Sequence, residues 1–389
     1  MRQLPFDYAF RNLGRSPLRL GLAVLGATLV VLLVLVAAGF VRGMHLTLTP
    51  AATLHENVIL LGVGSEESLE RSEIDAGTDT IAAASIPGIK HVGGVAFVSP
   101  EVHVALPLRL EPEGAEVETV LRGVRETAYL VHPHVEIVDG RRPRGGENEM
   151  LVGGLAATRL GVDEARVAVG QTLWLDGEPW EIVGRFAAPG TVMDAEIWTP
   201  LADLQVATQR ESTLSAVIVS LGSASFTDVD VFAKSRLDLE VSAVRERDYY
   251  AALDRFYGPI KQMVLVTTAL IALGGLLGGL NTMYAAFAAR VREVGMLQAL
   301  GFTRVAVLLS FAEESLFAAA CGTLVGLAVG RLLLDGVAVR FSMGAFELML
   351  DPPVMLAATG AGLLVGVVGA IPPAVRCLRL PIPAALKSY

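Results

Sequence analysis

Only two cysteines, Cys321 and Cys377, occur among the 389 residues of this sequence. Each lies in or beside a different apolar run, so we expect no disulfide between them. The sequence has no GxSxG nucleophile elbow, no HExxH zinc motif and no CxxC pair. The Walker A pattern GxxxxGK[ST] is also absent, which excludes ATP binding of that kind within this sequence. We therefore predict no catalytic residue and no cofactor bound by this chain.

Charged residues make up only 18% of the sequence, and they are unevenly distributed. Residues 43–258 hold 33 acidic and 17 basic residues, a net charge of −16. The remainder holds 7 acidic and 14 basic residues, a net charge of +7. The basic residues of the remainder flank apolar runs, which is typical of membrane proteins rather than nucleic-acid-binding proteins. We expect membrane lipid to be a partner and nucleic acid not to be one.

Four apolar runs are each long enough to cross a bilayer as a helix, which takes about 20 residues. They are residues 20–42, 259–289, 305–334 and 353–373. Arginines precede the first run, separate the second from the third and follow the fourth, so the positive-inside rule places both termini in the cytoplasm. The predicted fold is a membrane α-helical protein with four transmembrane helices, arranged 1+3. A large mixed α/β extracytoplasmic domain over residues 43–258 lies between helices 1 and 2.

The shorter segments follow from this topology. Residues 1–19 interleave arginines with aromatic and apolar residues, which predicts an amphipathic cytoplasmic N-terminus in the membrane interface. A plain basic flank before the first span is the alternative. Residues 290–304 form a cytoplasmic segment, residues 335–352 an outer loop, and residues 374–389 a cytoplasmic tail.

The extracytoplasmic domain has short apolar runs bounded by Gly, Pro and Asp, which predict strands. Asp176-Gly177 predicts a two-residue hairpin turn, because both residues tolerate positive φ. A further strand is expected over residues 226–230. Residues 244–263 are expected to form one helix that continues into the second span.

Glycines recur four residues apart in the apolar runs, a spacing that lets helices approach closely in lipid. We expect them to mark helix packing, either within the subunit or across a dimer. These glycines are Gly274, Gly278, Gly322, Gly326, Gly330, Gly362 and Gly366.

Two acidic residues, Glu313 and Glu314, lie inside the third run. An acid within a span suggests an ion or substrate pathway. The favoured interpretation is that they lie near the cytoplasmic interface and pair with Arg290, Arg292 or Arg304.

His132 and His134 suggest a metal site, but Pro133 separates them and no third ligand is evident. We therefore predict no metal site. A membrane-anchored enzyme would need a polar cluster in the extracytoplasmic domain, and the sequence shows none.

The order of these segments resembles the permeases of MacB/FtsX/LolC-type ABC transporters over nearly the whole chain. Within residues 150–184, a short strand, a Leu-Ala helix and a hairpin ending in Ile182-Val183-Gly184 resemble the MacB periplasmic core. Residues 380–386 resemble the family's Pro-x-x-Ala-Leu ending. The sharpest correspondence is Asn281, then Arg290-Val291-Arg292-Glu293-Val294-Gly295, then Ala299-Leu300-Gly301.

The resemblance implies a coupling segment that sits in a groove of a separate ABC ATPase, which acts as a dimer and binds ATP and Mg. Val294, Leu297 and Leu300 fall at helical spacing and are expected to form one apolar face toward that groove. The coupling residues are Arg290, Arg292, Glu293, Val294, Gly295, Leu297, Leu300, Gly301 and Arg304.

The implied function is mechanotransmission in the bacterial inner membrane. ATP hydrolysis by the partner would move the extracytoplasmic domain and export or extract a substrate from the periplasmic side or outer leaflet. A second permease copy or paralogue is expected, with a periplasmic adaptor or lipoprotein as a further candidate partner. The alternative is an FtsX-like regulator of an extracytoplasmic cell-wall hydrolase. The size of residues 43–258 favours transport.

Overall fold

The computed structural model describes the whole chain except residues 1–16, 50–55, 289, 342–343, 379–380 and 382–389. Its internal contacts divide the chain into two compact units. The predicted amphipathic segment, except for its last residues, and the Pro-x-x-Ala-Leu ending lie outside the described residues, as does the side chain of Asn281. The helical unit comprises Met1–Arg42, Pro259–Val337 and Leu348–Tyr389, and the sheet unit comprises Gly43–Gly258 and Ala338–Glu347.

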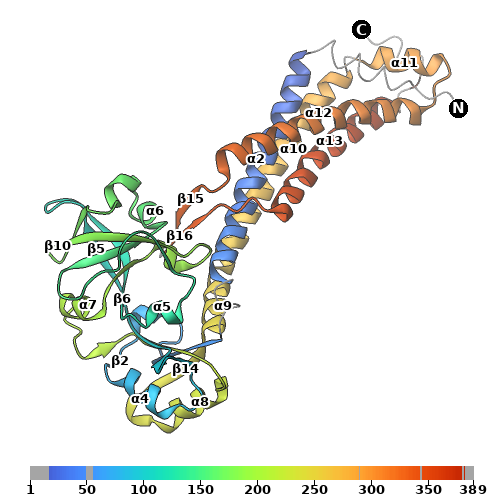
Figure 1. Ribbon diagram of the computed structural model, residues 1–389. Coiled ribbons are helices and arrows are strands. Elements are labelled where there is room, and N and C mark those ends of the chain that lie inside the picture. Colours follow the sequence, from blue (N-terminus) through green and yellow to red (C-terminus); the bar gives the residue numbers. More distant parts are fainter. Residues whose placement is uncertain (1–16, 50–55, 289, 342–343, 379–380, 382–389) are drawn as a thin grey trace. The chain divides into compact units, whose positions relative to one another are not determined.

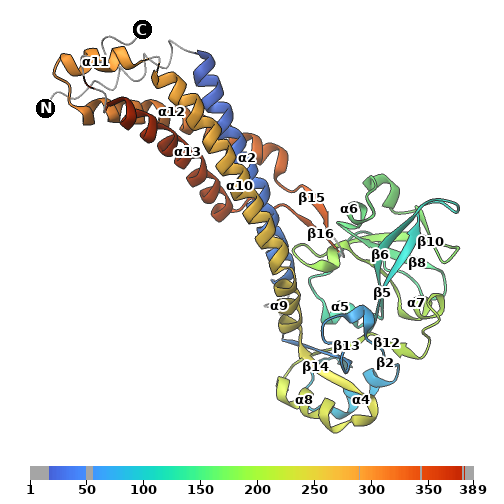
Figure 2. The same ribbon diagram turned by 180° about the vertical axis from the view of Figure 1, so that it is seen from behind.

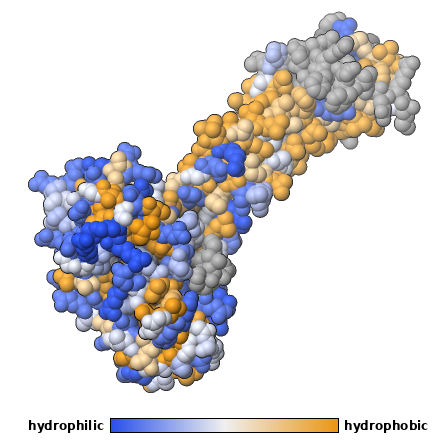
Figure 3. Space-filling view, viewed as in Figure 1, coloured by the Kyte–Doolittle hydropathy of each residue, from blue (hydrophilic) through white to orange (hydrophobic). Residues whose placement is uncertain are grey.

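Four long helices lie side by side in the helical unit (Figures 1 and 2). All four are long and apolar enough to cross a membrane, as the sequence predicts. Apolar residues also dominate the visible face of this unit (Figure 3), as expected for helices in contact with lipid. The long helices are α2 (Pro17–Leu48), α10 (Gly258–Ala288), α12 (Arg304–Leu334) and α13 (Pro352–Leu378), and the short α11 is Val291–Ala299.

The predicted packing glycines fall into two groups. Three on α12 face α2: a Cβ added at Gly322 would lie 2.7 Å from the Cβ of Ala27, and Gly326 and Gly330 are similarly crowded. Gly362 and Gly366 on α13 face α12 in the same way. Among the described residues, in contrast, a Cβ added at Gly274 or Gly278 on α10 would meet nothing within 4 Å. Glycine therefore brings α2, α12 and α13 into close approach.

The sheet unit is built on a ten-stranded sheet in the order β14-β1-β13-β5-β6-β11-β8-β10-β7, with β9 beside β10 and β5. Its strands are β1 (Asn57–Gly62), β5 (Val98–Arg109), β6 (Glu116–Val124), β7 (Glu136–Gly140), β8 (Glu149–Gly153), β9 (Thr172–Leu175), β10 (Glu178–Ala187), β11 (Ile197–Pro200), β13 (Ala216–Ser220) and β14 (Val241–Arg245). Short pairs are formed by β2 (Ile74–Asp75) with β12 (Thr213–Leu214) and by β3 (His91–Val92) with β4 (Val95–Ala96).

Short helices cover this sheet. They are α4 (Thr78–Ser85), α5 (Ala128–Val131), α6 (Ala156–Leu160), α7 (Leu201–Ala207), α8 (Phe226–Ser235) and α9 (Glu246–Phe256), with the 3-10 turns η1 (Leu69–Arg71), η2 (Glu164–Val167), η3 (Val192–Ala195) and η4 (Leu237–Leu239).

Strand β1 shows why the sheet is covered on both faces. Successive side chains of a strand point to opposite faces, and here Val58 and Leu60 join one buried cluster while Ile59 and Leu61 join another. A strand that is apolar at every position must be buried on both sides. The core of the sheet unit therefore consists of two layers with β1 between them.

The predicted hairpin turn is confirmed. Asp176 has φ 51° and Gly177 has φ 82°, and they connect β9 to β10 with Leu175 paired to Glu178. Positive φ at both central residues is the requirement that makes Asp-Gly a favoured sequence for such turns.

The strand expected over residues 226–230 is wrong, because this segment begins helix α8. The carboxylate of Asp228 accepts hydrogen bonds from the backbone N–H and the hydroxyl of Ser225, both at 2.8 Å. This reciprocal cap satisfies a backbone group at the helix start. Val229, Phe232 and Ala233 then fall at helical spacing and are buried.

The single helix expected over residues 244–263 is also interrupted. Strand β14 continues to Arg245, α9 ends at Phe256, and Tyr257 forms a turn before α10 begins. Pro259 has no backbone N–H, so it fits the first turn of a new helix rather than the middle of a continuous one.

The predicted outer loop contains a β-hairpin that belongs to the sheet unit. Strand β15 (Ala338–Phe341) pairs antiparallel with β16 (Gly344–Glu347). The ring of Phe341 lies 5.6 Å from that of Tyr257, and Phe346 is buried. The connection between α12 and α13 is thus anchored to the sheet unit by its aromatic residues.

Candidate functional site

The predicted coupling segment forms the short helix α11, between α10 and α12. Val294 is fully buried and Val291 is 9% exposed, in a cluster with residues of α12 and α13. Leu297 packs partly against the same cluster. The expected apolar face of Val294, Leu297 and Leu300 is therefore not available as a whole, because the helical unit itself covers most of it.

A different stripe of α11 is exposed. Arg292, Met296 and Leu300 lie four residues apart, on one side of the helix. Met296 is 48% exposed and Leu300 67% exposed, and Arg292 is also exposed. We call these three residues the α11 stripe.

The other predicted coupling residues lie around this stripe. Glu293 is half-buried and Gly295 is buried. Gly301 has φ +91°, a conformation that suits glycine, where the chain turns toward α12. Arg304 is exposed at the start of α12.

One of the two acids in the third span pairs as predicted. The Nη1 of Arg290 donates to Oε2 of Glu314 at 3.0 Å, and both side chains are largely buried. Glu313, in contrast, is exposed. The pairing of Glu314 with Arg290 is confirmed, and it joins the start of α11 to α12.

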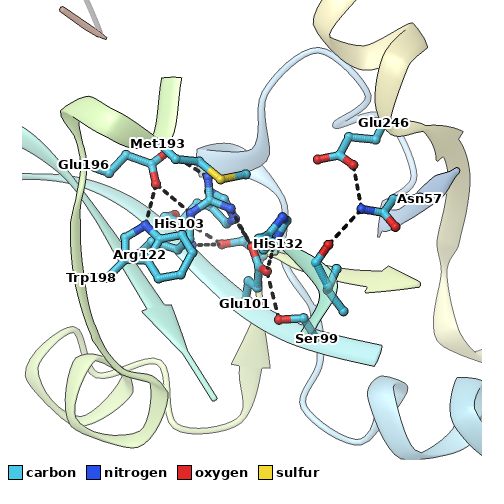
Figure 4. A network of polar contacts seen from close by, with 12 residues as sticks. Asn57, Ser99, Glu101, His103, Arg122, His132, Met193, Glu196, Trp198 and Glu246 are labelled. Carbon is cyan, nitrogen blue, oxygen red and sulfur yellow. Dashed lines mark hydrogen bonds and ion pairs between the residues drawn. The ribbon is translucent and has the colours of Figure 1, made fainter. Parts of the chain in front are cut away.

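The sheet unit contains a buried polar network that the sequence did not reveal (Figure 4). At its centre, Arg122 of β6 donates from Nε and Nη2 to the two carboxylate oxygens of Glu196, each at 2.7 Å. Its Nη1 donates to Glu101 of β5, also at 2.7 Å. Trp198 of β11 donates to Glu196 at 2.9 Å. One guanidinium thus ties together two strands and the start of a third.

Histidines complete the network. Nε2 of His132 lies 2.8 Å from Glu101, and Nε2 of His103 lies 3.0 Å from the same carboxylate. The hydroxyl of Ser99 donates to Glu101 at 2.9 Å. His134 contacts the sulfur of Met193 instead, so the two histidines of the His-Pro-His motif have separate partners. Among the described residues, no group of three His, Cys, Asp or Glu could hold a metal ion.

The network keeps its charges. Burial alone would raise the pKa of Glu101, but His132 and Arg122 hold that pKa well below its ordinary value. Burial likewise opposes ionisation of Glu196, and Arg122 still keeps its pKa lowered. Burial would lower the pKa of Arg122, whereas Glu196 and Glu101 raise it well above its ordinary value. The three groups are therefore ionised together.

The expectation that this domain has no polar cluster was wrong. A local signal was present, because Glu101 and His103 are two apart in an apolar strand and so share one face. Their partners Arg122 and His132 lie 21 and 31 residues after Glu101 in the sequence, and no local pattern connects them. The arginine and both carboxylates are matched in hydrogen bonds, so the arrangement suits holding strands together more than performing chemistry.

Residues 20–235 match the MacB-like periplasmic core domain, and residues 265–382 match the FtsX-like permease C-terminal domain. The chain belongs to the ABC transporter permeases of the MacB/FtsX type. The two matches cover the sheet unit up to α8 and the last three long helices of this permease.

Two relatives illustrate the range of the family. The permease is 23% identical over 341 residues to the uncharacterized ABC transporter permease YknZ of Bacillus subtilis, covering 83% of each chain. It is 23% identical over 362 residues to the macrolide export ATP-binding/permease protein MacB of Shewanella sp. W3-18-1. That match covers 83% of this chain but only 54% of the longer relative.

Solved structures similar to the permease include the periplasmic region of MacB from Actinobacillus actinomycetemcomitans. The TM-score is 0.38 at 9% identity, covering 51% of this chain and 92% of that structure. The extracellular domain of YknZ gives a TM-score of 0.35 at 15% identity, covering 49% of this chain and all of that structure.

Proposed function

We propose that this permease couples ATP hydrolysis on a separate ABC ATPase to movement of its sheet unit, on the extracytoplasmic side of a bacterial inner membrane. In this proposal α11 and both termini are cytoplasmic, ATP and Mg²⁺ bind the partner, and a second permease copy or paralogue completes the dimer. The arginines around the apolar runs support this orientation. The absence of a Walker A pattern from this sequence supports a separate ATPase.

The observation that carries the proposal is how the long helices join the sheet unit along the chain. The last turn of α2 is part of the sheet unit, and α9 of the sheet unit precedes α10 by a single residue. Helices α12 and α13 are connected through the β15–β16 hairpin, which also belongs to the sheet unit. Movement of any long helix is therefore passed on through covalent connections, which suits mechanotransmission.

The α11 stripe is the proposed contact with the ATPase. Met296 and Leu300 expose apolar area beside the positive charge of Arg292. A short exposed apolar stripe with an arginine suits insertion into a groove, because apolar residues and arginine are enriched in the cores of interfaces.

Leu300→Asp tests this contact. The permease would be co-expressed with the ABC ATPase encoded nearest to its gene, reconstituted in nanodiscs, and assayed for complex formation and ATPase activity. A carboxylate in the centre of an apolar contact should lower the stimulated ATPase activity at least about tenfold, the equivalent of ~1.4 kcal/mol. Leu237→Asp is the matched control, because Leu237 is 81% exposed and lies in the sheet unit.

Wild-type assembly and activity for Leu300→Asp would contradict the proposal. Co-purification of a cell-wall hydrolase, with no transported substrate, would instead favour the FtsX-like regulator.

A further inference from the structure

The sheet unit holds a cavity of about 890 Å³, which we call the chamber. Its size falls within the ~300–1,000 Å³ typical of sites for small molecules. Every residue that lines it belongs to the sheet unit. Much of its wall is aromatic, formed by Tyr249, Tyr250, Phe256, Tyr257, Phe341 and Phe346.

Three deeply buried lining residues belong to the polar network. His103 and Arg122 are each 2% exposed, and Glu196 is 5% exposed. Because Arg122 is fully paired with Glu196 and Glu101, these charges compensate one another. A ligand here gains little from presenting a charge of its own and more from apolar contact with the aromatic wall.

Another part of the lining is polar and accessible. Glu66, Glu67 and Glu70 line the chamber from the segment around η1, and Glu67 is exposed. Arg71 and Arg255 line it as well, and both are exposed. The chamber therefore combines an apolar wall with a hydrated, charged edge, and both are needed to hold a molecule with two kinds of surface.

We propose that the chamber binds an amphipathic molecule of lipid or drug size, with its hydrocarbon or ring portion against the aromatic wall and its polar end at the Glu66–Glu70 edge. Both a bilayer lipid and a free amphiphile from the extracytoplasmic side have this chemistry.

The lining also connects the chamber to the spans, and this step rests on the proposed function. Met44, Thr47 and Leu48 are the last turn of α2, and Phe256 and Tyr257 immediately precede α10. Phe341 and Phe346 lie in the hairpin between α12 and α13. The segments that continue from all four spans thus form the wall, and their movement changes the space available to the ligand.

Site-resolved photolabelling tests the binding step. Full-length permease in nanodiscs, without any ATPase, receives either diazirine-tagged palmitic acid from solution or diazirine-tagged phosphatidylglycerol within the bilayer. Labelled peptides are then mapped by mass spectrometry. We expect label on residues 249–257 and on the hairpin from at least one probe, and the probe that labels identifies the source of the ligand.

Two matched substitutions on α9 locate the site. Ala252 lines the chamber and the adjacent Ala251 does not, so Ala252→Trp fills the space and Ala251→Trp is the control. Chamber labelling should fall at least tenfold in Ala252→Trp and stay at the wild-type level in Ala251→Trp. Phe256→Ala removes an aromatic wall residue that is 73% exposed, so it should reduce labelling several-fold without disturbing the fold.

Failure of this proposal is distinguishable from failure of the proposed function. No label on the chamber from either probe, or full labelling in both Ala252→Trp and Phe256→Ala, would overturn it. Leu300→Asp should label as wild type, because binding does not depend on the ATPase contact.

Discussion

Both units bury an arginine against carboxylates, but the two arrangements differ in bond length and in how deeply the side chains are buried. In the sheet unit, Arg122 makes three hydrogen bonds of 2.7 Å to Glu101 and Glu196, with all three side chains at most 7% exposed. In the helical unit, Arg290 donates to Glu314 at 3.0 Å with its own side chain 11% exposed, and the nearby Glu293 is 44% exposed.

The difference corresponds to what each arginine connects. Arg122 joins neighbouring strands of one sheet, where any shift would leave a buried charge unpaired. Arg290 joins the start of the short helix α11 to α12 through a longer bond to Glu314, and its more exposed side chain makes a shift of that bond less costly. Under the proposed function, mechanotransmission would require a rigid sheet in one unit and an adjustable contact between α11 and α12 in the other.

Removal of Arg122 should have the largest effect on stability. In Arg122→Met, two buried carboxylates lose their shared cation, and breaking such a buried pair costs about 3–5 kcal/mol. Thermal unfolding of the full-length permease in detergent would measure this loss. Arg142→Met is the control, because the Arg142 side chain is 49% exposed and pairs with an exposed Glu126; it should change stability by no more than ~0.5 kcal/mol. Equal stabilities for the two variants would show that the network does not hold the sheet.

Glycine substitution gives the next largest effect and compares two faces of the helical unit. A side chain at position 362 would collide with Thr323 and Val31, so Gly362→Val should cost about 1–3 kcal/mol through overpacking. A side chain at position 274 would meet nothing within 4 Å, so Gly274→Val should stay within ~0.5 kcal/mol of wild type. Thermal unfolding in nanodiscs would measure both. A large loss for Gly274→Val would indicate instead that α10 packs against another chain.

Arg290 should give a smaller loss than Arg122. Arg290→Leu leaves Glu314 without this cation, but the longer bond and the greater exposure of Arg290 limit the cost to about 1–2 kcal/mol, below the ~3–5 kcal/mol of a fully buried network. Stimulated ATPase activity should fall as well, because α11 loses this ion pair to α12. Adding Glu314→Gln removes the carboxylate charge that lost this cation and should recover most of the stability. A loss of stability equal to that of Arg122→Met would show that the two buried arginines do not differ in their contribution to stability.

The features that the sequence predicts best are those required by the bilayer or by the backbone conformation of a short turn. A bilayer requires long apolar runs, so the sequence predicts the four long helices. The Asp176-Gly177 turn is predicted because both residue types tolerate positive φ. Helix α8 was missed although Ser225 and Asp228 provide a capping signal, because its apolar residues also suit a strand. The break before α10 has a local signal, because Pro259 fits the first turn of a new helix.

Long-range pairing could not be predicted in this way. Strand β1 pairs with β13 and β14, more than 150 residues later in the chain, and the network around Arg122 joins residues from 99 to 198. At α11, helical spacing predicted one apolar face of Val294, Leu297 and Leu300, but the fold buries Val294 and leaves Leu300 exposed. Amphipathicity identifies a buried face without identifying what buries it.

Mild acidification should have the smallest effect on the stability of the fold. The sign of this effect follows from the pKa shifts. Glu101 and Glu196 have lowered pKa values in the fold. Their contribution is complete above the pKa of the unfolded chain, about 4.3 for Glu. It is lost as pH falls through that value toward the folded pKa, because the unfolded state then binds more protons. The melting temperature of the full-length permease should therefore stay constant with respect to these two groups above about pH 5 and fall from about pH 5 toward pH 3.

Glu246 provides an opposing control within the same region. Burial raises its pKa, so its ionisation works against folding, and its contribution to stability decreases as pH rises. The amide of Asn57 donates to Glu246 at 2.8 Å, and the carbonyl of a glutamine can accept the same bond. Glu246→Gln should therefore slightly raise the melting temperature at pH 7 and leave it unchanged at pH 4, which steepens the dependence on acid. If Glu246→Gln flattened that dependence instead, the acid sensitivity would arise from Glu246, and the matched charges around Arg122 would not be its source.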